Sequence, residues 1–372
     1  MKLKIALLPG DGIGPEVAAQ AVACLQAVEE AFGHQFEFTK APVGAIAIDQ
    51  TGNPLPDDTL ELCKQSDAVL FGAIGDPKYD NDPESKVRPE QGLLRLRKEL
   101  GLFSNIRPVK VFPTLIDKSP LRKERIENTD FVIYRELTGG IYFGEKFLSE
   151  DGNTASDLCI YSEEEISRIT HLAFKAAKGR RKKLTLVDKA NVLESSRLWR
   201  RVVTRIGESY PDVELHYLFV DNAAMQMILN PSQFDVILTE NMFGDILSDE
   251  GSVIGGSIGL LPSASVGESS AMFEPIHGSY PQATGKNIAN PIASILSAAM
   301  LLDHFGLDEE AAAVVRSVNK ALKKGMVTPD LDPKSKHGTD DVGQFIAGHI
   351  SDSDDFKGLN QENIGLGKST II

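Results

Sequence analysis

The sequence predicts an α/β fold built on a largely parallel sheet. Short apolar runs typical of buried strands alternate with longer amphipathic segments typical of helices over most of the chain. Hydrophobic residues make up 42% of the sequence and charged residues 25%, as in ordinary globular proteins. A length of 372 residues allows two domains or one large domain.

The predicted elements follow in chain order. Strands are expected at residues 5–8, 67–73, 130–134, 184–187, 215–220 and 236–238. Helices are expected at residues 15–32, 93–100, 163–178, 291–305 and 309–324. Pro15 fits the first turn of the first helix, Asn290 is expected to cap the fourth, and Gly325 is expected to end the fifth. Residues 141–150 are β-rich and break the alternation, which indicates an added arm or hairpin. The polar residues from about Ser351 are expected to form a tail.

Composition narrows the possible functions. A net charge of −14 argues against binding to nucleic acid or to anionic membranes, and an acidic substrate would need locally concentrated Arg and Lys. Cys24, Cys63 and Cys159 are far apart and form no C-x-x-C pair, which argues against a disulfide framework or a zinc site and favours a reducing cytoplasm. No apolar run is long enough for a signal peptide or a membrane span.

The segment 239–251 carries the clearest chemical signal. The apolar run at residues 236–238 ends at a Thr-Glu-Asn turn, and helix-like sequence follows. Asp245 and Asp249 are four residues apart, which places both carboxylates on one helix face. Hard oxygen ligands of this kind suit Mg²⁺ or Mn²⁺. The alternative is a solvated acidic helix start, which explains Asp245 more easily than Asp249.

A glycine-rich loop at residues 8–16, Leu-Pro-Gly-Asp-Gly-Ile-Gly-Pro-Glu, joins the first strand to the first helix. The dinucleotide fingerprint of a Rossmann domain requires G-x-G-x-x-G, and Pro15 occupies the position of its third glycine. The loop alone therefore predicts a tight turn and names no cofactor.

Taken together, several motifs resemble those of the isocitrate and isopropylmalate dehydrogenases, the family of β-decarboxylating dehydrogenases. The motifs are the loop at residues 9–16, the segment 241–249 continued by 255–263, and the segments 274–279 and 285–291. The resemblance runs from about residue 3 to about residue 348.

This resemblance implies a two-domain fold that is not a Rossmann fold, with a mixed sheet flanked by helices and a β-rich dimer arm. Residues 1–102 and 256–348 would form the cofactor-binding domain. Residues 103–255 would form the substrate-binding and dimerisation domain, with the arm near residues 141–155. Residues 349–372 would form a C-terminal tail.

The resemblance also implies a malate-type substrate with two carboxylates. Arg97, Arg107 and Arg135 lie in segments similar to the substrate-binding ones of the family, and an Arg fork binds a carboxylate with two hydrogen bonds. Arg135 ends an apolar strand, where a charge without a function is costly. Arg95 is two residues from Arg97 and so lies on a different helix face.

Substrate choice is expected to depend on Glu90, Leu93 and Leu94. Isocitrate enzymes commonly place Ser at the position of Leu93. The two leucines suit a branched alkyl group and would leave a carboxylate desolvated without a partner. The implied reaction is oxidative decarboxylation of 3-isopropylmalate to 4-methyl-2-oxopentanoate, the precursor of leucine. The alternative is that Leu93 and Leu94 are two core residues of an amphipathic helix.

Tyr142 and Lys189 match the catalytic residues of the family, and Asp221 matches a carboxylate that joins Asp245 and Asp249 at the metal and also contacts the substrate. Within the family, Lys189 and Asp221 would come from the second subunit, which implies a homodimer with shared active sites. Lys189 would remove the proton of the C2 hydroxyl, NAD⁺ would accept the hydride, and Tyr142 would protonate carbon after CO₂ leaves.

Cofactor contacts are implied for seven residues: Ile13, Glu90, His277, Gly278, Ser279, Gln282 and Asn290. NAD-dependent relatives often carry Asp at the position of Gln282, whereas NADP-dependent relatives tend to have Lys-Tyr where this chain has Gln282-Ala283. We therefore expect NAD⁺, with looser discrimination against NADP⁺.

Two other functions stay open. The chain could act on a smaller alkylmalate, tartrate, homoisocitrate or isocitrate, and a substrate panel separates these. It could also be a non-catalytic metal- or nucleotide-binding module on the same scaffold. The presence of Tyr142, Lys189 and all three aspartates argues against such a module.

Overall fold

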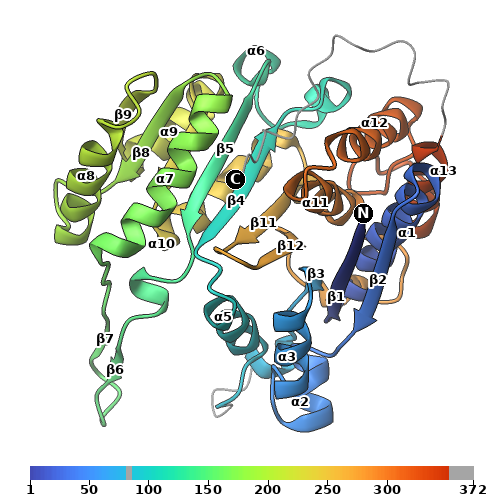
Figure 1. Ribbon diagram of the computed structural model, residues 1–372, viewed down its shortest axis with the longest axis horizontal. Coiled ribbons are helices and arrows are strands. Elements are labelled where there is room, and N and C mark those ends of the chain that lie inside the picture. Colours follow the sequence, from blue (N-terminus) through green and yellow to red (C-terminus); the bar gives the residue numbers. More distant parts are fainter. Residues whose placement is uncertain (81–85, 352–372) are drawn as a thin grey trace.

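A ten-stranded mixed sheet forms the centre of the molecule and carries helices on both faces (Figure 1). The structure, a computed structural model, describes residues 1–80 and 86–351. The strand order is β2 (Gln35–Lys40), β1 (Lys2–Gly10), β3 (Ala68–Ala73), β12 (Ala271–Pro275), β11 (Pro262–Val266), β4 (Ser104–Lys110), β5 (Asp130–Glu136), β10 (Val236–Thr239), β8 (Lys183–Asp188) and β9 (Glu214–Phe219). The pairs β12–β11, β11–β4 and β4–β5 are antiparallel, and the other neighbours are parallel. This arrangement confirms the predicted α/β class with a mixed sheet.

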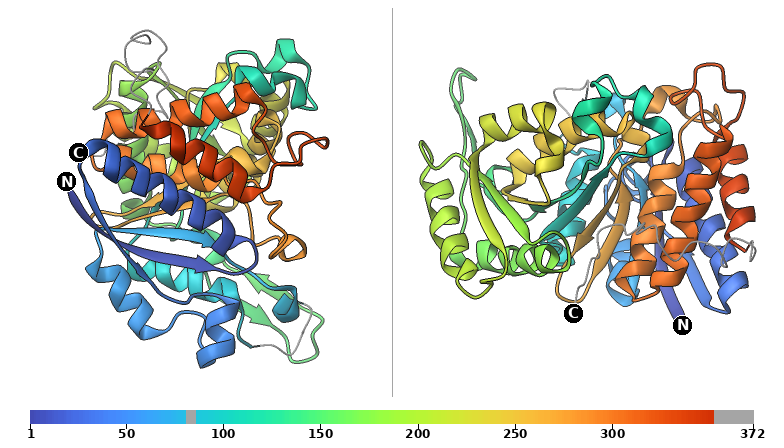
Figure 2. Two further views of the ribbon diagram at one scale, coloured as in Figure 1. Left: turned by 90° about the vertical axis from the view of Figure 1, so that its right-hand side faces the viewer. Right: turned by 90° about the horizontal axis from the view of Figure 1, so that it is seen from above.

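The strand order bears on the predicted division into domains. The strands from β2 to β11 come from residues 1–102 and 256–348, and those from β4 to β9 come from residues 103–255. Seen from above, the green and yellow segments gather at one end of the molecule, and the blue and red ones gather at the other (Figure 2). The two sets meet at the β11–β4 pair. Two domains joined by one continuous sheet stay a prediction.

One face of the sheet is covered by a continuous apolar core. The helices that contribute to it are α1 (Gly14–Phe32), α7 (Glu163–Gly179), α8 (Glu194–Gly207), α11 (Ile292–His304), α12 (Asp308–Lys324) and α13 (Thr339–Ile350). Large side chains such as Trp199 and Phe174 are fully buried in this core. Its size is what holds both halves of the sheet in one body.

On the other face the apolar packing is interrupted. One cluster lies under α3 (Asp57–Gln65) and α5 (Pro89–Glu99), and a second lies under α9 (Val220–Leu229) and α10 (Asn241–Gly255). Between them, β12, β11, β4 and β5 turn polar side chains to this face, because their alternate residues enter the first core. These polar residues are Ser263, Ser265, Glu274, Asn105, Arg107 and Arg135. This polar strip at the centre of the sheet positions the candidate site.

Shorter elements complete the chain. They are α2 (Ala45–Thr51), α4 (Pro77–Asp80), α6 (Lys123–Ile126) and the 3₁₀ turns η1 (Pro113–Lys118), η2 (Gly140–Tyr142), η3 (Pro231–Gln233), η4 (Ile258–Leu260) and η5 (Pro281–Ala283). A hairpin of β6 (Lys146–Leu148) and β7 (Ala155–Asp157) projects from the body below α7 in Figure 1. None of the helices in the described part of the chain is long and apolar enough to cross a membrane.

Each predicted strand and helix has a counterpart in the structure, with four corrections. Residues 141–150 are not β-rich throughout, because Tyr142 lies in η2 and the hairpin contributes only residues 146–148 there. Val220 begins α9 and does not end the preceding strand. His349 and Ile350 complete α13, so the predicted tail falls outside the described residues from residue 352 onward. Asn290 Oδ1 accepts from the Ile292 backbone N–H at 3.1 Å, although the N-cap position of α11 is Pro291 and not Asn290 as predicted.

The glycine loop is explained by close backbone packing. Gly10 has a φ of +70°, and a Cβ there would lie 1.9 Å from the Ala73 carbonyl oxygen. A Cβ at Gly12 would lie 2.0 Å from the carbonyl oxygen of Ser279. The loop therefore needs glycine to let the end of β3 and the segment after β12 approach it.

Candidate active site

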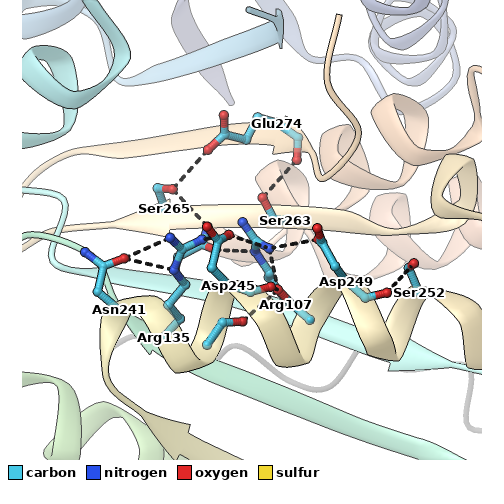
Figure 3. A network of polar contacts seen from close by, with 12 residues as sticks. Arg107, Arg135, Asn241, Asp245, Asp249, Ser252, Ser263, Ser265 and Glu274 are labelled. Carbon is cyan, nitrogen blue, oxygen red and sulfur yellow. Dashed lines mark hydrogen bonds and ion pairs between the residues drawn. The ribbon is translucent and has the colours of Figure 1, made fainter. Parts of the chain in front are cut away.

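Two carboxylates on α10 face two arginines of the central strands. Arg135 Nη1 on β5 donates to Asp245 Oδ1, and Arg107 Nη1 on β4 lies 3.6 Å from the same oxygen (Figure 3). Arg107 Nη1 also lies 3.9 Å from Asp249 Oδ1. The two aspartates therefore share one face of α10, as their spacing predicts, and the Arg107 guanidinium forms an ion pair with each of them.

Tyr142 joins this cluster from η2. Its hydroxyl donates to Asp245 Oδ2 at 3.0 Å, and its ring centroid lies 5.8 Å from the Arg135 guanidinium carbon. Burial, and then the Asp245 carboxylate, raise the pKa of Tyr142. The phenol is therefore protonated at neutral pH and able to donate a proton.

Burial leaves the cluster electrostatically strained. It lowers the pKa of Arg135 to about 9, and the neighbouring Arg107 contributes to that shift. Burial also lowers the pKa of Arg107. On the acidic side, burial raises the pKa of Asp249, and Asp245 acts in the same direction while Arg107 opposes it. A divalent cation at the carboxylates together with an anionic ligand at the arginines would relieve both.

Arg97 approaches the strip from α5. Its Nη2 donates to Glu274 Oε1 at 2.8 Å, and Ser265 Oγ donates to the same oxygen at 3.3 Å. Arg95, two residues earlier, donates instead to Asp57 Oδ1 at 2.9 Å and to the Leu55 carbonyl. The two arginines point to different neighbours, as their spacing on a helix predicts.

The two leucines of α5 differ in their surroundings. Leu93 packs partly on the apolar cluster under α3 and α5. Leu94 is half buried and belongs to none of the apolar clusters formed by the described residues. Both leucines therefore keep some exposed apolar surface, and Leu93 is in addition partly packed into the core.

Lys189 and Asp221 form a second group. Lys189 follows β8, Asp221 lies in the first turn of α9, and Lys189 Nζ donates to Asp221 Oδ1. The hydrogen bond from Lys189 lowers the pKa of Asp221. Among the described residues, no group of three or more His, Cys, Asp or Glu side chains could hold a metal ion. One chain thus does not bring Asp221 to Asp245 and Asp249.

Three of the expected cofactor residues converge at the carboxyl ends of β1 and β3. Ile13 donates its backbone N–H to the Ser279 carbonyl at 2.8 Å. A Cβ at Gly75 would lie 3.1 Å from Glu90 Oε1 and 3.5 Å from Ser279 Oγ. This is the end of parallel strands at which α/β proteins bind ligands.

The other expected cofactor residues are linked to this region in two ways. Asn290 and His277 both interact with Asp330, and Gly278 and Gln282 lie close to Ser279 in the sequence. Asn290 Nδ2 donates to Asp330 Oδ2 at 3.1 Å, and the Asp330 carboxylate also interacts electrostatically with His277. A Cβ at Gly278 would meet nothing within 4 Å, so this backbone is open to a ligand. Gln282 lies in η5, which follows Gly278 and Ser279 in the sequence.

The chain is similar to known proteins over most of its length. The family model for isocitrate/isopropylmalate dehydrogenase matches residues 4–346. The chain belongs to the isocitrate/isopropylmalate dehydrogenase family.

Relatives within this family cover almost the whole chain. The 3-isopropylmalate dehydrogenase of Bacteroides fragilis (strain YCH46) is 56% identical over 94% of this chain and 99% of its own length. That of Bacillus subtilis (strain 168) is 56% identical over 89% of this chain and 92% of its own. The crystal structure of isocitrate dehydrogenase from Methylococcus capsulatus superposes with a TM-score of 0.85, at 34% identity over 94% of this chain and 99% of that one.

Dehydrogenases of this family imply a metal and a nucleotide cofactor, and the donors found here fit a metal in part. Asp245 and Asp249 supply hard oxygen atoms on one helix face. Burial raises the pKa of Asp249, and a bound cation would lower it. Asp221 is the third carboxylate expected, and it contacts Lys189 instead. The three carboxylates expected at a metal are therefore not brought together within one chain.

Several residues of the site were not assigned a role from the sequence. Asn105, Asn241, Ser248, Ser265 and Glu274 bind the arginines or each other. Glu274 and Asn241 stand inside the family motifs, but the motif alone does not say which group they contact. For Asn105, Ser265 and Glu274 the available signal was a polar side chain in a buried strand.

Glu240 provides a pH-dependent test of this region. It is 4% exposed, and among the described residues its Oε2 has no hydrogen-bond partner. Burial, and then the carboxylates of Asp188 and Glu136, raise the pKa of Glu240 to about 7. The contribution of Glu240 to the free energy of unfolding is therefore fully present at acid pH. It is lost as the pH rises through about 7, because the folded state must then hold an ionised Glu240.

We expect Glu240→Gln to be more stable than the wild type at pH 8, by about 2–3 kcal/mol, and this gain to shrink towards pH 5. Urea unfolding at both pH values measures it. The matched control is Glu268→Gln, at an exposed position, which should show no such trend. Parallel stability curves for the wild type and Glu240→Gln would contradict the account.

Proposed function

We propose that this chain is an NAD-dependent 3-isopropylmalate dehydrogenase, which oxidises and decarboxylates 3-isopropylmalate to 4-methyl-2-oxopentanoate in leucine biosynthesis. The observation that carries the proposal is the cluster in which Asp245 contacts Arg107, Arg135 and Tyr142. It combines anion-binding, metal-binding and proton-donating groups in one place. Relatives 56% identical that carry this enzyme name support the substrate.

The arginines would bind the two carboxylates of the substrate. Arg107 and Arg135 are buried, and their charge is only partly compensated within the chain, so an anionic ligand is favoured there. Arg97 approaches from the other half of the sheet and would close on the same ligand. Leu94 offers the apolar surface that an isopropyl group requires, and it would exclude the additional carboxylate of isocitrate.

Asp245 and Asp249, with Asp221, would hold Mg²⁺ or Mn²⁺. When bound, this cation supplies a Lewis acid beside the C2 oxygen, and NAD⁺ supplies the hydride acceptor. Ile13, Glu90, Ser279 and their neighbours would orient the nucleotide at the ends of β1 and β3.

The proton transfers belong to Lys189 and Tyr142. Lys189, as the neutral amine, would take the proton of the C2 hydroxyl, and Asp221 would hold the ammonium group that results through the hydrogen bond between the two side chains. Tyr142 would deliver its phenolic proton to carbon after CO₂ has left. Its raised pKa keeps that proton in place until it is needed.

The active unit is proposed to be a homodimer. Apolar side chains that one chain leaves exposed occur on α9 (Met225, Ile228, Leu229), on α10 (Ile246, Val253) and on the hairpin (Phe147, Leu148). Such a surface favours association with a second copy. A second copy would also supply the Lys189–Asp221 pair that the Asp245 cluster lacks. The three cysteines are free, which fits a reducing cytoplasm.

The test of this proposal is NADH formation from 3-isopropylmalate and NAD⁺ with Mg²⁺ present. We expect turnover to stop with a chelator and to return with added Mg²⁺ or Mn²⁺. Asp249→Asn should lower kcat/KM by about a hundredfold or more, because it removes a charged metal ligand. The exposed Asp212→Asn is the matched control and should match the wild type.

Three outcomes would contradict the proposal in different ways. Preference for isocitrate, homoisocitrate, tartrate or a smaller alkylmalate would reassign the substrate within the family. No NADH with any 2-hydroxy diacid would favour a non-catalytic binding module. Unchanged turnover and metal dependence in Asp249→Asn would make the acidic pair an ordinary surface feature.

Cofactor preference follows from Gln282. We expect kcat/KM to be higher with NAD⁺ than with NADP⁺, since Gln282-Ala283 offers no cation for a 2′-phosphate. Gln282→Asp should lower the activity with NADP⁺ further, because a carboxylate repels that phosphate. Steady-state rates with both nucleotides measure this. A ratio above one in favour of NADP⁺ in the wild type would refute it.

A further inference from the structure

Each of the two arginines in the Asp245 cluster is held by an asparagine. Arg135 donates from Nε at 3.1 Å and from Nη2 at 2.8 Å to Asn241 Oδ1 (Figure 3). Arg107 donates from Nε at 2.5 Å to Asn105 Oδ1. Asn105 and Asn241 are at most 1% exposed. The side of each guanidinium that carries Nε is thus fixed by an uncharged acceptor.

The orientation of both amides is determined by their other hydrogen bonds. Asn241 Nδ2 donates to the Gly139 carbonyl at 3.1 Å, just before the turn that carries Tyr142. Asn105 Nδ2 donates to Ser265 Oγ at 3.1 Å and to the Ala264 carbonyl at 3.4 Å. Because an NH₂ group can only donate, each Oδ1 must face its arginine.

Other buried or partly buried arginines of this chain use carboxylates as partners. Arg97 pairs with Glu274, Arg180 with Asp235, and Arg200 with Asp188 through two hydrogen bonds. A carboxylate compensates the charge of a buried guanidinium and is the usual solution. At Arg107 and Arg135 an amide oxygen accepts these hydrogen bonds instead. The amide fixes the orientation of the guanidinium group but does not neutralise its charge.

Asp245 also contacts both guanidinium groups, but it is one of the carboxylates proposed to hold the cation. Ser248 Oγ is the other neutral acceptor for Arg107. The two amides thus fix the arginine side chains and leave the positive charge of each guanidinium free to attract an anionic ligand. A carboxylate in place of either amide would form a charge-assisted pair with the arginine and repel an incoming anion.

We propose that Asn105 and Asn241 are positioning residues that hold Arg107 and Arg135 in place while keeping their positive charge available for the carboxylates of the substrate. The inference rests on the proposed function only in taking the substrate to be a 2-hydroxy dicarboxylate. Asn241 has a second effect, because it ties Arg135 to the backbone that leads to Tyr142. Asn105 links Arg107 on β4 to Ser265 on β11, where the two halves of the sheet meet.

The experiment compares a charged with a neutral acceptor at the same place. Asn105→Asp and Asn241→Asp keep an acceptor oxygen and nearly the same shape, and Asn105→Ser keeps a smaller neutral acceptor. We expect KM for the substrate to rise about tenfold or more in each Asp variant, with a much smaller change in kcat. Asn105→Ser should lie between the wild type and Asn105→Asp. KM for NAD⁺ should change little.

The opposite order would overturn the inference. If these residues are only structural acceptors, Asp serves as well as Asn, and Asn105→Asp will have a lower KM than Asn105→Ser. Asn319→Asp, on α12, is the control for adding one negative charge. If Asn241→Asp does not fold, the order at position 105 decides. A wild type that oxidises no dicarboxylate rejects the proposed function, whereas an active wild type with unchanged Asp variants rejects only this inference.

Discussion

The burial of arginines next to Asp245 is the constraint on which the rest of the structure depends. A guanidinium removed from water needs hydrogen bonds and compensating charge, or the fold loses several kcal/mol. The structure meets this need at one place, the polar strip between two apolar clusters on one face of the sheet. Strands β11, β4 and β5 turn polar side chains to that face while their alternate residues complete the large core on the other. The site is thus part of the sheet and does not rest on loops alone.

The same constraint explains what the sequence could and could not predict. Asp245 and Asp249 lie on one helix face because their spacing is local, and Arg135 could be singled out because it ends an apolar strand. Arg97 and Arg95 could be separated for the same local reason. Glu274, Ser265 and Asn105 were not predicted as partners, because their contacts depend on the register between strands far apart in sequence. Leu93 stays a predicted substrate contact, and it also packs partly against an apolar cluster whose members come from several distant elements.

Tyr142 shows a further limit of sequence patterns. Its neighbours Ile141 and Phe143 favour a strand, but the chain makes a 3₁₀ turn in which Gly140 has a φ of +73°. A Cβ at Gly140 would lie 2.3 Å from the Tyr161 hydroxyl, so tertiary packing sets this turn. That turn brings the Tyr142 hydroxyl to Asp245. Local propensity gave way here to packing against Tyr161, about twenty positions further along the chain.

We propose that each active site combines the Asp245 cluster of one subunit with the Lys189–Asp221 pair of another. Mixing the inactive variants Lys189→Ala and Asp249→Asn, by dissociation and reassociation or by co-expression, tests it most directly. If sites are shared, half of the randomly formed dimers are mixed and each holds one intact site, so activity returns to about a quarter of the wild-type value. If each chain forms its own site, every site keeps one lesion, and the mixture will remain as inactive as its parents.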